Sequence, residues 1–215
     1  MSASTEFLDA LTRGDRRSAE RLVDAALDRG AHLRDLYLET IQPAMQEVGR
    51  LWQENRLSVA EEHLATAITQ AAMGRAFERV YRWYDRRTPT LIAACADDER
   101  HQMGLRMLCD LLELEGWDTT YLGATVPVES LVDMVEKRRP DVVALSAAIA
   151  PHLPRVRAAI EAIRASSVSP MPQIVIGGRA IGGDEALAKR LGADFTAADA
   201  SDAVRDLTAR FADRR

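Results

Sequence analysis

Residues 90–104 read TLIAACADDERHQMG, an apolar run followed at once by a polar, acidic loop. The run Thr90–Ala96 predicts a buried β-strand, because a short apolar stretch bounded by polar residues is typical of a strand covered on both faces. Apolar residues recur at helical spacing after Gly104, which predicts an amphipathic helix. We therefore expect His101 in a loop at the carboxyl end of a strand, where open α/β sheets bind their ligands.

The loop around His101 supports two interpretations. Glu99 lies two residues before His101 and could take the proton of one ring nitrogen. The other nitrogen would then be free as a metal ligand in a fixed tautomer, and Gly104 would let a bulky ligand pass close to the backbone. Alternatively, His101 is a surface residue, and the acidic residues Asp97, Asp98 and Glu99 favour a helix N-terminus through its dipole. The loop alone does not decide between them.

Composition excludes several classes of protein. The 215 residues carry a net charge of −5 and 47% hydrophobic residues, which suits one large domain or two small ones. Lys and Arg form no cluster, which disfavours nucleic-acid binding by this chain alone. We find no membrane-spanning run and no signal peptide, so we expect no membrane partner and a cytoplasmic location. Cys95 and Cys109 lie in apolar segments and are expected to be buried thiols without a disulfide.

Residues 1–87 predict an antiparallel four-helix bundle. Helical spacing of apolar residues recurs along this part of the chain, and no strand pattern interrupts it. Asp15 is expected to cap the second helix, and Ser58 with Glu61 to form a capping box at the start of the fourth. Pro43 is expected to kink the long third helix.

Residues 88–215 predict a flavodoxin-like, or Rossmann-like, α/β domain with a five-stranded parallel sheet. Strand-like runs alternate there with helical segments, which is the pattern of successive βαβ units. The polar segment Asp85–Pro89 between the two parts predicts a domain boundary. The expected strands are Thr90–Ala96, Thr119–Leu122, Val142–Ser146, Ile174–Ile176 and Asp194–Thr196.

Several motifs resemble the cobalamin-binding domains of the methionine synthase and methylmalonyl-mutase type. The signature of that family is Asp-x-His-x-x-Gly, then Ser-x-Leu, then Gly-Gly, each at a strand end. The corresponding residues here are Glu99–Gly104, Ser146–Ala148, Gly177 and Gly178. Glu99 stands where the family has aspartate, and Ala148 where it has leucine. The first half of the chain resembles the helical cap of such domains through Ile41–Met45 and Val48–Trp52.

The resemblance implies a bound cobalamin whose nucleotide tail leaves the cobalt and enters a crevice of the sheet, with the corrin between sheet and bundle. His101 would then be the lower axial ligand of the cobalt, and Ser146 would hydrogen-bond the buried dimethylbenzimidazole. Gly177 and Gly178 would let the backbone approach the tail, where a Cβ atom would clash. The residues expected to contact the cofactor are Trp52, Glu62, His63, Glu99, Arg100, His101, Gln102, Met103, Gly104, Ser146, Ala148, Gly177 and Gly178.

Trp52, Glu62 and His63 form the pattern Trp-x9-Glu-His, which resembles cobalamin photoreceptors of the light-dependent MerR-type repressor kind. The resemblance implies that Trp52 packs over the upper axial group, and that Glu62 and His63 contact an adenosyl ligand. The alternatives are core packing for the tryptophan and a capping turn for the Glu-His pair. Gln53 replaces the histidine that captures cobalt in those repressors after illumination, so capture from that position is excluded.

Two functions are expected, and a cobalamin store or chaperone without signalling is a third option. The first is a stand-alone light sensor, not an enzyme, that holds adenosylcobalamin and signals to a protein partner, because the chain starts at the bundle without the DNA-binding domain of the repressors. The second is a corrinoid carrier that shuttles methyl groups between methyltransferase subunits. A bilin such as biliverdin, held as in photocobilins by Tyr81, Trp83 and Tyr84, is an alternative to bundle packing of those aromatics. A homo-oligomer is left open, and His32 and His152 are expected on the surface.

Overall fold

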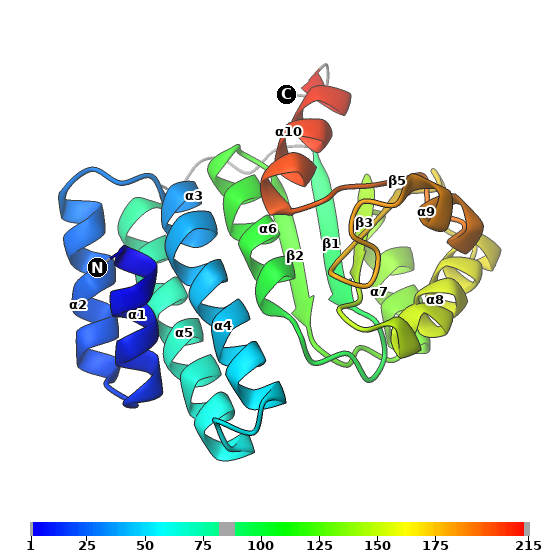
Figure 1. The fold of residues 1–215 in the computed structure, drawn as a ribbon. Helices are drawn as coiled ribbons and strands as arrows, with labels where there is room; N and C mark the ends of the chain where they lie inside the picture. The colour runs from blue at the N-terminus through cyan, green and yellow to red at the C-terminus, as the bar shows by residue number, and fades with distance from the viewer. Residues whose placement is uncertain (1, 82–88, 213–215) are drawn as a thin grey trace. The chain divides into compact units, whose positions relative to one another are not determined.

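The computed structural model describes residues 2–81 and 89–212. The chain divides into two compact units, Met1–Arg82 and Trp83–Arg215. The first consists of helices, and the second contains a β-sheet with helices on both faces (Figure 1). The linker expected at Asp85–Pro89 falls, except for Pro89, outside the described residues, as do Trp83 and Tyr84.

Four helical stretches build the first unit, as predicted. They pack as α1 against α2, α2 against α5, and α4 against both α1 and α5. The third stretch is composite, because a short α-helix and a π-helical segment lead into α4. The elements are α1 (Ala3–Thr12), α2 (Arg16–Asp28), α3 (Leu33–Asp35), η1 (Leu36–Ile41), α4 (Gln42–Gln53) and α5 (Val59–Val80).

The helix ends follow the local sequence. Asp15 accepts a hydrogen bond from the Ser18 backbone at 3.0 Å, and Ser58 and Glu61 form the predicted capping box. Pro43 lies in the first turn of α4, directly after the π-helical segment η1. Proline has no N–H to donate within a helix, and a wider turn before it accommodates that loss. The π-helical segment thus lies just before Pro43, and the kink expected at Pro43 stays a prediction.

The sheet of the second unit has the order β2-β1-β3-β4-β5, and all pairs are parallel. This is the predicted flavodoxin-like order. The register pairs Cys95 with Ser146 and Ser146 with Gly177, so the loops that follow three central strands start side by side at one edge. The strands are β1 (Thr90–Cys95), β2 (Asp118–Gly123), β3 (Val142–Ser146), β4 (Gln173–Gly177) and β5 (Phe195–Thr196).

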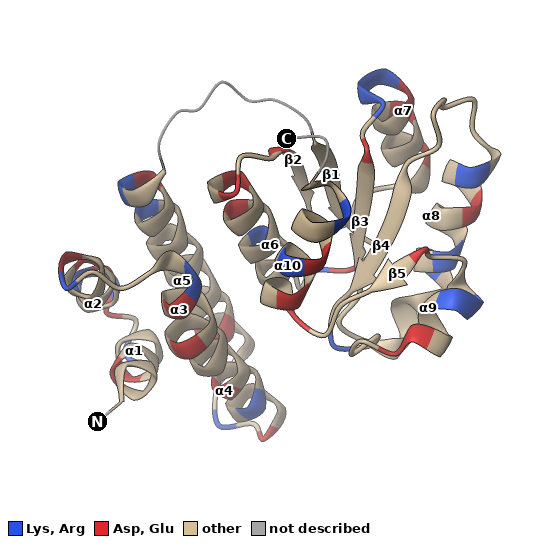
Figure 2. Cartoon of the chain, turned by 90° about the horizontal axis from the view of Figure 1, so that it is seen from above, with Lys and Arg blue, Asp and Glu red and all other residues tan. Residues whose placement is uncertain are grey.

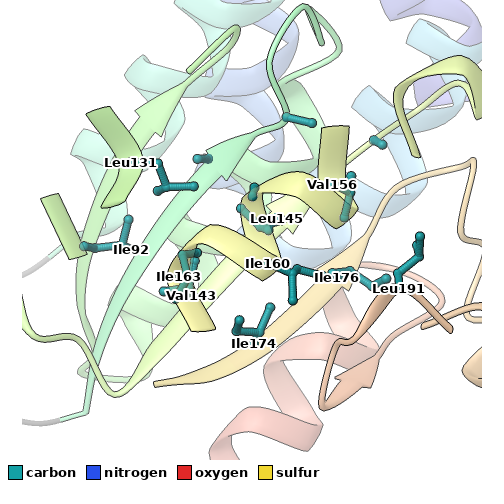
Figure 3. Close-up of a cluster of buried hydrophobic side chains, with 14 of the residues drawn as sticks. Ile92, Leu131, Val143, Leu145, Val156, Ile160, Ile163, Ile174, Ile176 and Leu191 are labelled. Carbon is teal, nitrogen blue, oxygen red and sulfur yellow. The ribbon is translucent and has the colours of Figure 1, made fainter. Parts of the chain in front are cut away.

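Two apolar cores lie on opposite faces of the sheet. Helices α6 (Met103–Leu114) and α10 (Ala200–Arg210) pack on one face. Helices α7 (Val128–Arg138), α8 (Leu153–Ala165) and α9 (Glu185–Leu191) pack on the other face. Figure 3 draws part of the buried side chains of this second core. Cys95 and Cys109 are buried free thiols, as expected.

Charged positions are distributed over both units. Figure 2 shows Lys and Arg positions interspersed with Asp and Glu positions along the helices. Among the described residues, every helix is too short or too polar to pass through a bilayer.

Candidate functional site

The candidate site lies at the carboxyl edge of the sheet, where the connections of β1 and β3 diverge. The chain leaves β1 toward α6 on one face, whereas it leaves β3 through η2 (Ala150–His152) toward α8 on the other face. Such a point of divergence opens the crevice in which α/β sheets bind ligands. Residues 96–102, called the His101 loop below, lie at this point.

A buried carboxylate joins the two diverging connections. The side chain of Glu99 is 0% exposed and accepts four hydrogen bonds. Its Oε1 accepts from the backbone N–H of His101 at 2.8 Å and from His101 Nδ1 at 2.5 Å. Its Oε2 accepts from the backbone N–H of Ala148 at 2.7 Å and from His152 Nδ1 at 2.9 Å.

These contacts keep Glu99 ionised. Burial alone raises the pKa of a carboxyl group, but the hydrogen bonds from His101, Ala148 and His152 outweigh burial and lower the pKa of Glu99 to about 2. An ionised carboxylate only accepts hydrogen bonds. The Nδ1 atom of His101 must therefore carry the proton, which leaves a lone pair on Nε2 when the ring is neutral.

His101 thus has the form of a metal-binding histidine with its partner carboxylate in place. Its side chain is 53% exposed, so a ligand can approach the ring. Within the described part of the chain, no three His, Cys, Asp or Glu side chains are grouped to hold a metal ion. A single such imidazole suits a metal whose other ligands arrive with it, as in a macrocycle.

His152 was expected on the surface, and the structure corrects this expectation. Its side chain is only 16% exposed, because the η2 turn brings it back against Glu99. Sequence reasoning missed this residue because its partner is 53 residues away, and no local pattern marks so distant a contact. His32, by contrast, is exposed as expected.

Arg155 is a second residue that the sequence did not reveal. It pairs with Asp97 at 3.1 Å and with Asp98 at 2.5 Å, so these carboxylates serve an ion pair with α8. Asp98 has a left-handed backbone with φ of 64°, which is uncommon for a residue with a side chain. The backbone N–H of Thr125 donates to the Glu99 carbonyl at 3.0 Å and holds the loop from the side of β2.

The two glycines at the end of β4 have different roles. A Cβ atom on Gly177 would meet nothing within 4 Å, so this strand end borders open space. On Gly178, where φ is 99°, it would lie 2.2 Å from the Ala147 carbonyl oxygen. Gly178 is therefore required by the close approach of the Ala147 backbone, and its expected contact with a ligand stays a prediction.

The other expected residues surround this edge. Ser146 is 8% exposed, and its hydroxyl makes no hydrogen bond to another described residue. A Cβ on Gly104 would also meet open space. The side-chain oxygen of Gln102 accepts a hydrogen bond from the Tyr121 hydroxyl at 2.8 Å, so it already has a partner. Arg100 is exposed and Met103 is half-buried.

The three expected residues of the helical unit lie at one end of it, where α4 ends and α5 begins. Trp52 is 44% exposed, so it is not a core residue. Glu62 Oε2 lies 2.7 Å from His63 Nδ1, and Glu62 Oε1 accepts from the Thr66 hydroxyl at 2.9 Å. The capping box uses Glu61 instead, so capping does not account for Glu62 and His63.

Comparisons with known proteins identify relatives of both units. Two family models, each described as a B12 binding domain, match residues 3–76 and 89–208. The HTH-type transcriptional repressor CarA of Myxococcus xanthus is 35% identical over 143 residues, which are 63% of this chain and 44% of the repressor. Trimethylamine corrinoid protein 1 of Methanosarcina acetivorans is 23% identical, with 91% of each chain covered.

A solved structure shares the fold. The monomethylamine corrinoid protein of Methanosarcina barkeri superposes with a TM-score of 0.81 at 18% identity, covering 95% of this chain and 96% of that one. The chain therefore matches this corrinoid protein over nearly its full length, whereas it spans less than half of the repressor CarA.

Replacing Glu99 by glutamine tests the role of the buried carboxylate. The amide keeps the size but loses one acceptor oxygen, which leaves buried N–H donors without a charged partner. We expect the free energy of unfolding to fall by about 3 kcal/mol, measured by urea denaturation of the ligand-free protein. Glu161→Gln on the exposed side of α8 should change it by less than about 0.5 kcal/mol. Equal stabilities of the two variants would contradict the assignment.

Alanine substitutions of Gly177 and Gly178 test the close approach of the Gly178 and Ala147 backbones. Gly178→Ala should destabilise the protein by about 3 kcal/mol, because it combines an unfavourable φ with a clash against backbone. Gly177→Ala meets open space and serves as the matched control, with an expected loss below about 1 kcal/mol. Thermal unfolding of both variants checks this, and a larger loss for Gly177→Ala would refute it.

Proposed function

The chain belongs to the family of B12 binding domains, and on this premise we propose that it is a cobalamin-binding light sensor with His101 as the lower axial ligand of the cobalt. Cobalamin binding is the property that the two matched domains share. The light response, the adenosyl form of the cofactor and a protein partner that receives the signal are the further content of the proposal.

The observation that carries the ligation is the contact between Glu99 and His101. The carboxylate occupies Nδ1 and orients the ring, so that His101 can give its Nε2 lone pair to a metal. A histidine held in this way is a stronger and better-positioned ligand than a free one. A bound cobalamin would bring the other ligands of its cobalt with it, and His101 would supply the ligand that comes from the protein.

The edge of the sheet fits the rest of the cofactor. Open space borders Gly177 and Gly104, and the Ser146 hydroxyl lies at the end of β3 between β1 and β4. This hydroxyl can donate to a ring nitrogen of a buried dimethylbenzimidazole. Glu99, Arg100, Gln102, Met103 and Ala148 would flank the cofactor through the loops that carry them.

Residues of the helical unit would contact the upper axial group. The exposed indole of Trp52 offers a flat apolar surface to an adenine or a corrin edge. The carboxylate of Glu62 has two partners, His63 and Thr66, and retains acceptor capacity for ribose hydroxyls. His63 is 66% exposed and could donate or accept through Nε2.

Bound adenosylcobalamin would supply a cobalt–carbon bond that visible light breaks. Trp52, Glu62 and His63 would then lose contacts that they make only in the dark. A ligand shifts a conformational equilibrium by its difference in affinity for the two states. Loss of those contacts would therefore change the stability of the helical unit's dark conformation and the surface that a partner meets.

A corrinoid methyl carrier is the second candidate. The favouring observation is coverage, because the trimethylamine and monomethylamine corrinoid proteins named above match this chain over nearly the full length of both chains. In that function His101 and Glu99 would hold the same cofactor, and a methyltransferase would be the partner. The two candidates differ in the group on the upper face and in the response to light.

The described aromatics offer limited support for a bilin. The Tyr81 ring stacks on Phe77 at 4.8 Å between centroids, which favours packing within the helical unit. Mass spectrometry of pigments from protein purified in the dark would identify the upper axial group and any biliverdin.

His101→Ala tests the lower ligand. The variant should lose the axial nitrogen, which changes the absorption spectrum of bound cobalamin. Binding should weaken by roughly 10-fold or more, since the loss of even a ligand's hydrogen-bond partner usually costs that much. Titration with cobalamin followed by absorption gives both readouts. His32→Ala, which removes an exposed histidine, is the control and should behave as wild type. An unchanged spectrum in His101→Ala would refute the ligation.

Illumination separates the two candidate functions. Protein loaded with adenosylcobalamin in the dark should show a lasting spectral change under green light while it stays folded. Trp52→Ala should retain cobalamin binding. Its ratio of affinities for the adenosyl over the methyl form should fall by roughly 10-fold, if an aromatic contact of about 1 to 1.5 kcal/mol is removed. Tight adenosylcobalamin binding without a lasting light response would favour the methyl carrier instead.

A further inference from the structure

The junction of η2 and α8 contacts the His101 loop at two points. His152, the last residue of η2, and Arg155, in the first turn of α8, both reach acidic residues of the loop. We propose that His152 and Arg155 are positioning residues that clamp the loop in its metal-binding conformation and so set the strength of cobalt ligation without touching the cobalt. The inference rests on the proposed function, since it assumes that His101 binds cobalt.

The inner contact acts through Glu99. His152 Nδ1 donates to Oε2 at 2.9 Å, while the ring of His101 occupies Oε1. The two imidazoles therefore hold opposite oxygens of one carboxylate and fix its rotation. Without His152, Oε2 would keep only the N–H of Ala148, and the carboxylate could turn away from the His101 ring. The His152 side chain is itself only 16% exposed, so the surrounding protein restricts its movement.

The outer contact acts on the backbone of the loop. Arg155 binds both Asp97 and Asp98, and Asp98 has the uncommon left-handed conformation. A residue in this conformation persists only when its surroundings hold it. These ion pairs are partly exposed, with the Arg155 side chain at 43%, so Arg155 should contribute less than His152.

The clamp anchors a loop to a rigid element. Val156 and Ile160 of α8 are buried in the core on one face of the sheet. The His101 loop continues into α6, whose Leu105 and Leu108 are buried in the core on the opposite face. The clamp therefore fixes the position of His101 relative to helices on both faces of the sheet. A shift of α8 would change the position of Glu99 and, through it, the orientation of the His101 ring.

Electron paramagnetic resonance of full-length protein loaded with cob(II)alamin tests the inference. Nitrogen-15 labelling of histidine distinguishes a histidine ligand from the cofactor's own benzimidazole by the changed hyperfine splitting. We expect wild type to show the histidine splitting. The measured quantity is the ratio of cobalt with a histidine ligand to cobalt without one. His152→Ala should lower this ratio by about 10-fold or more, as is usual for partners of a metal ligand. Arg155→Ala should lower it by roughly 2- to 5-fold, as for an exposed ion pair.

Two further variants separate positioning from general destabilisation. His152→Gln keeps an N–H donor for Glu99 and should restore most of the splitting. Arg157→Ala removes an arginine of the same helix that donates to the Arg190 carbonyl instead, and it should match wild type. If His152→Ala fails to fold, the ordering of Arg155→Ala below Arg157→Ala still tests the clamp.

The outcomes also separate the inference from the function beneath it. Wild-type splitting in His152→Ala or, with folded protein, equal ratios in Arg155→Ala and Arg157→Ala would overturn the clamp and leave His101 ligation intact. Absence of histidine splitting in wild type would overturn His101 ligation itself and the clamp with it.

Discussion

The structure of the sheet unit's functional edge depends on one buried carboxylate. Glu99 has no exposed surface and four N–H donors, so its charge is compensated at the point where β1 and β3 send their chains to opposite faces. A buried charge without such partners would be strongly destabilising. Glu99 thus joins the loop after β1 to the segment after β3. It also orients the His101 ring so that Nε2 is available to a ligand.

Local signals in the sequence predicted most of the fold and, of the candidate site, the pair of Glu99 and His101. The five strands, the capping box at Ser58 and the pairing of Glu99 with His101 each follow from patterns of a few residues. His152 and Arg155 could not be found in this way, because they meet the loop across more than 50 residues of sequence. The clash that requires Gly178 is likewise a long-range backbone contact with Ala147.

The helical unit provides the distinction between the two candidate functions. Both would use the same lower ligand, and the relatives include a transcriptional repressor and corrinoid proteins. A tryptophan that is nearly half exposed at the end of α4 contributes little to its own core, which supports a contact with something outside the bundle. Glu62 and His63, paired with each other beside the start of α5, add polar groups suited to a nucleoside more than to a methyl group.

The protonation state of His101 in the ligand-free protein tests the central claim most directly, because it is the property that Glu99 imposes. Nitrogen-15 NMR of histidine-labelled protein near neutral pH distinguishes the two neutral tautomers by their ring-nitrogen shifts and couplings. The account predicts that neutral His101 carries its proton on Nδ1, the ring nitrogen that faces the Glu99 carboxylate. A neutral ring protonated on Nε2 in the wild-type protein would contradict it, since no lone pair would then face the metal.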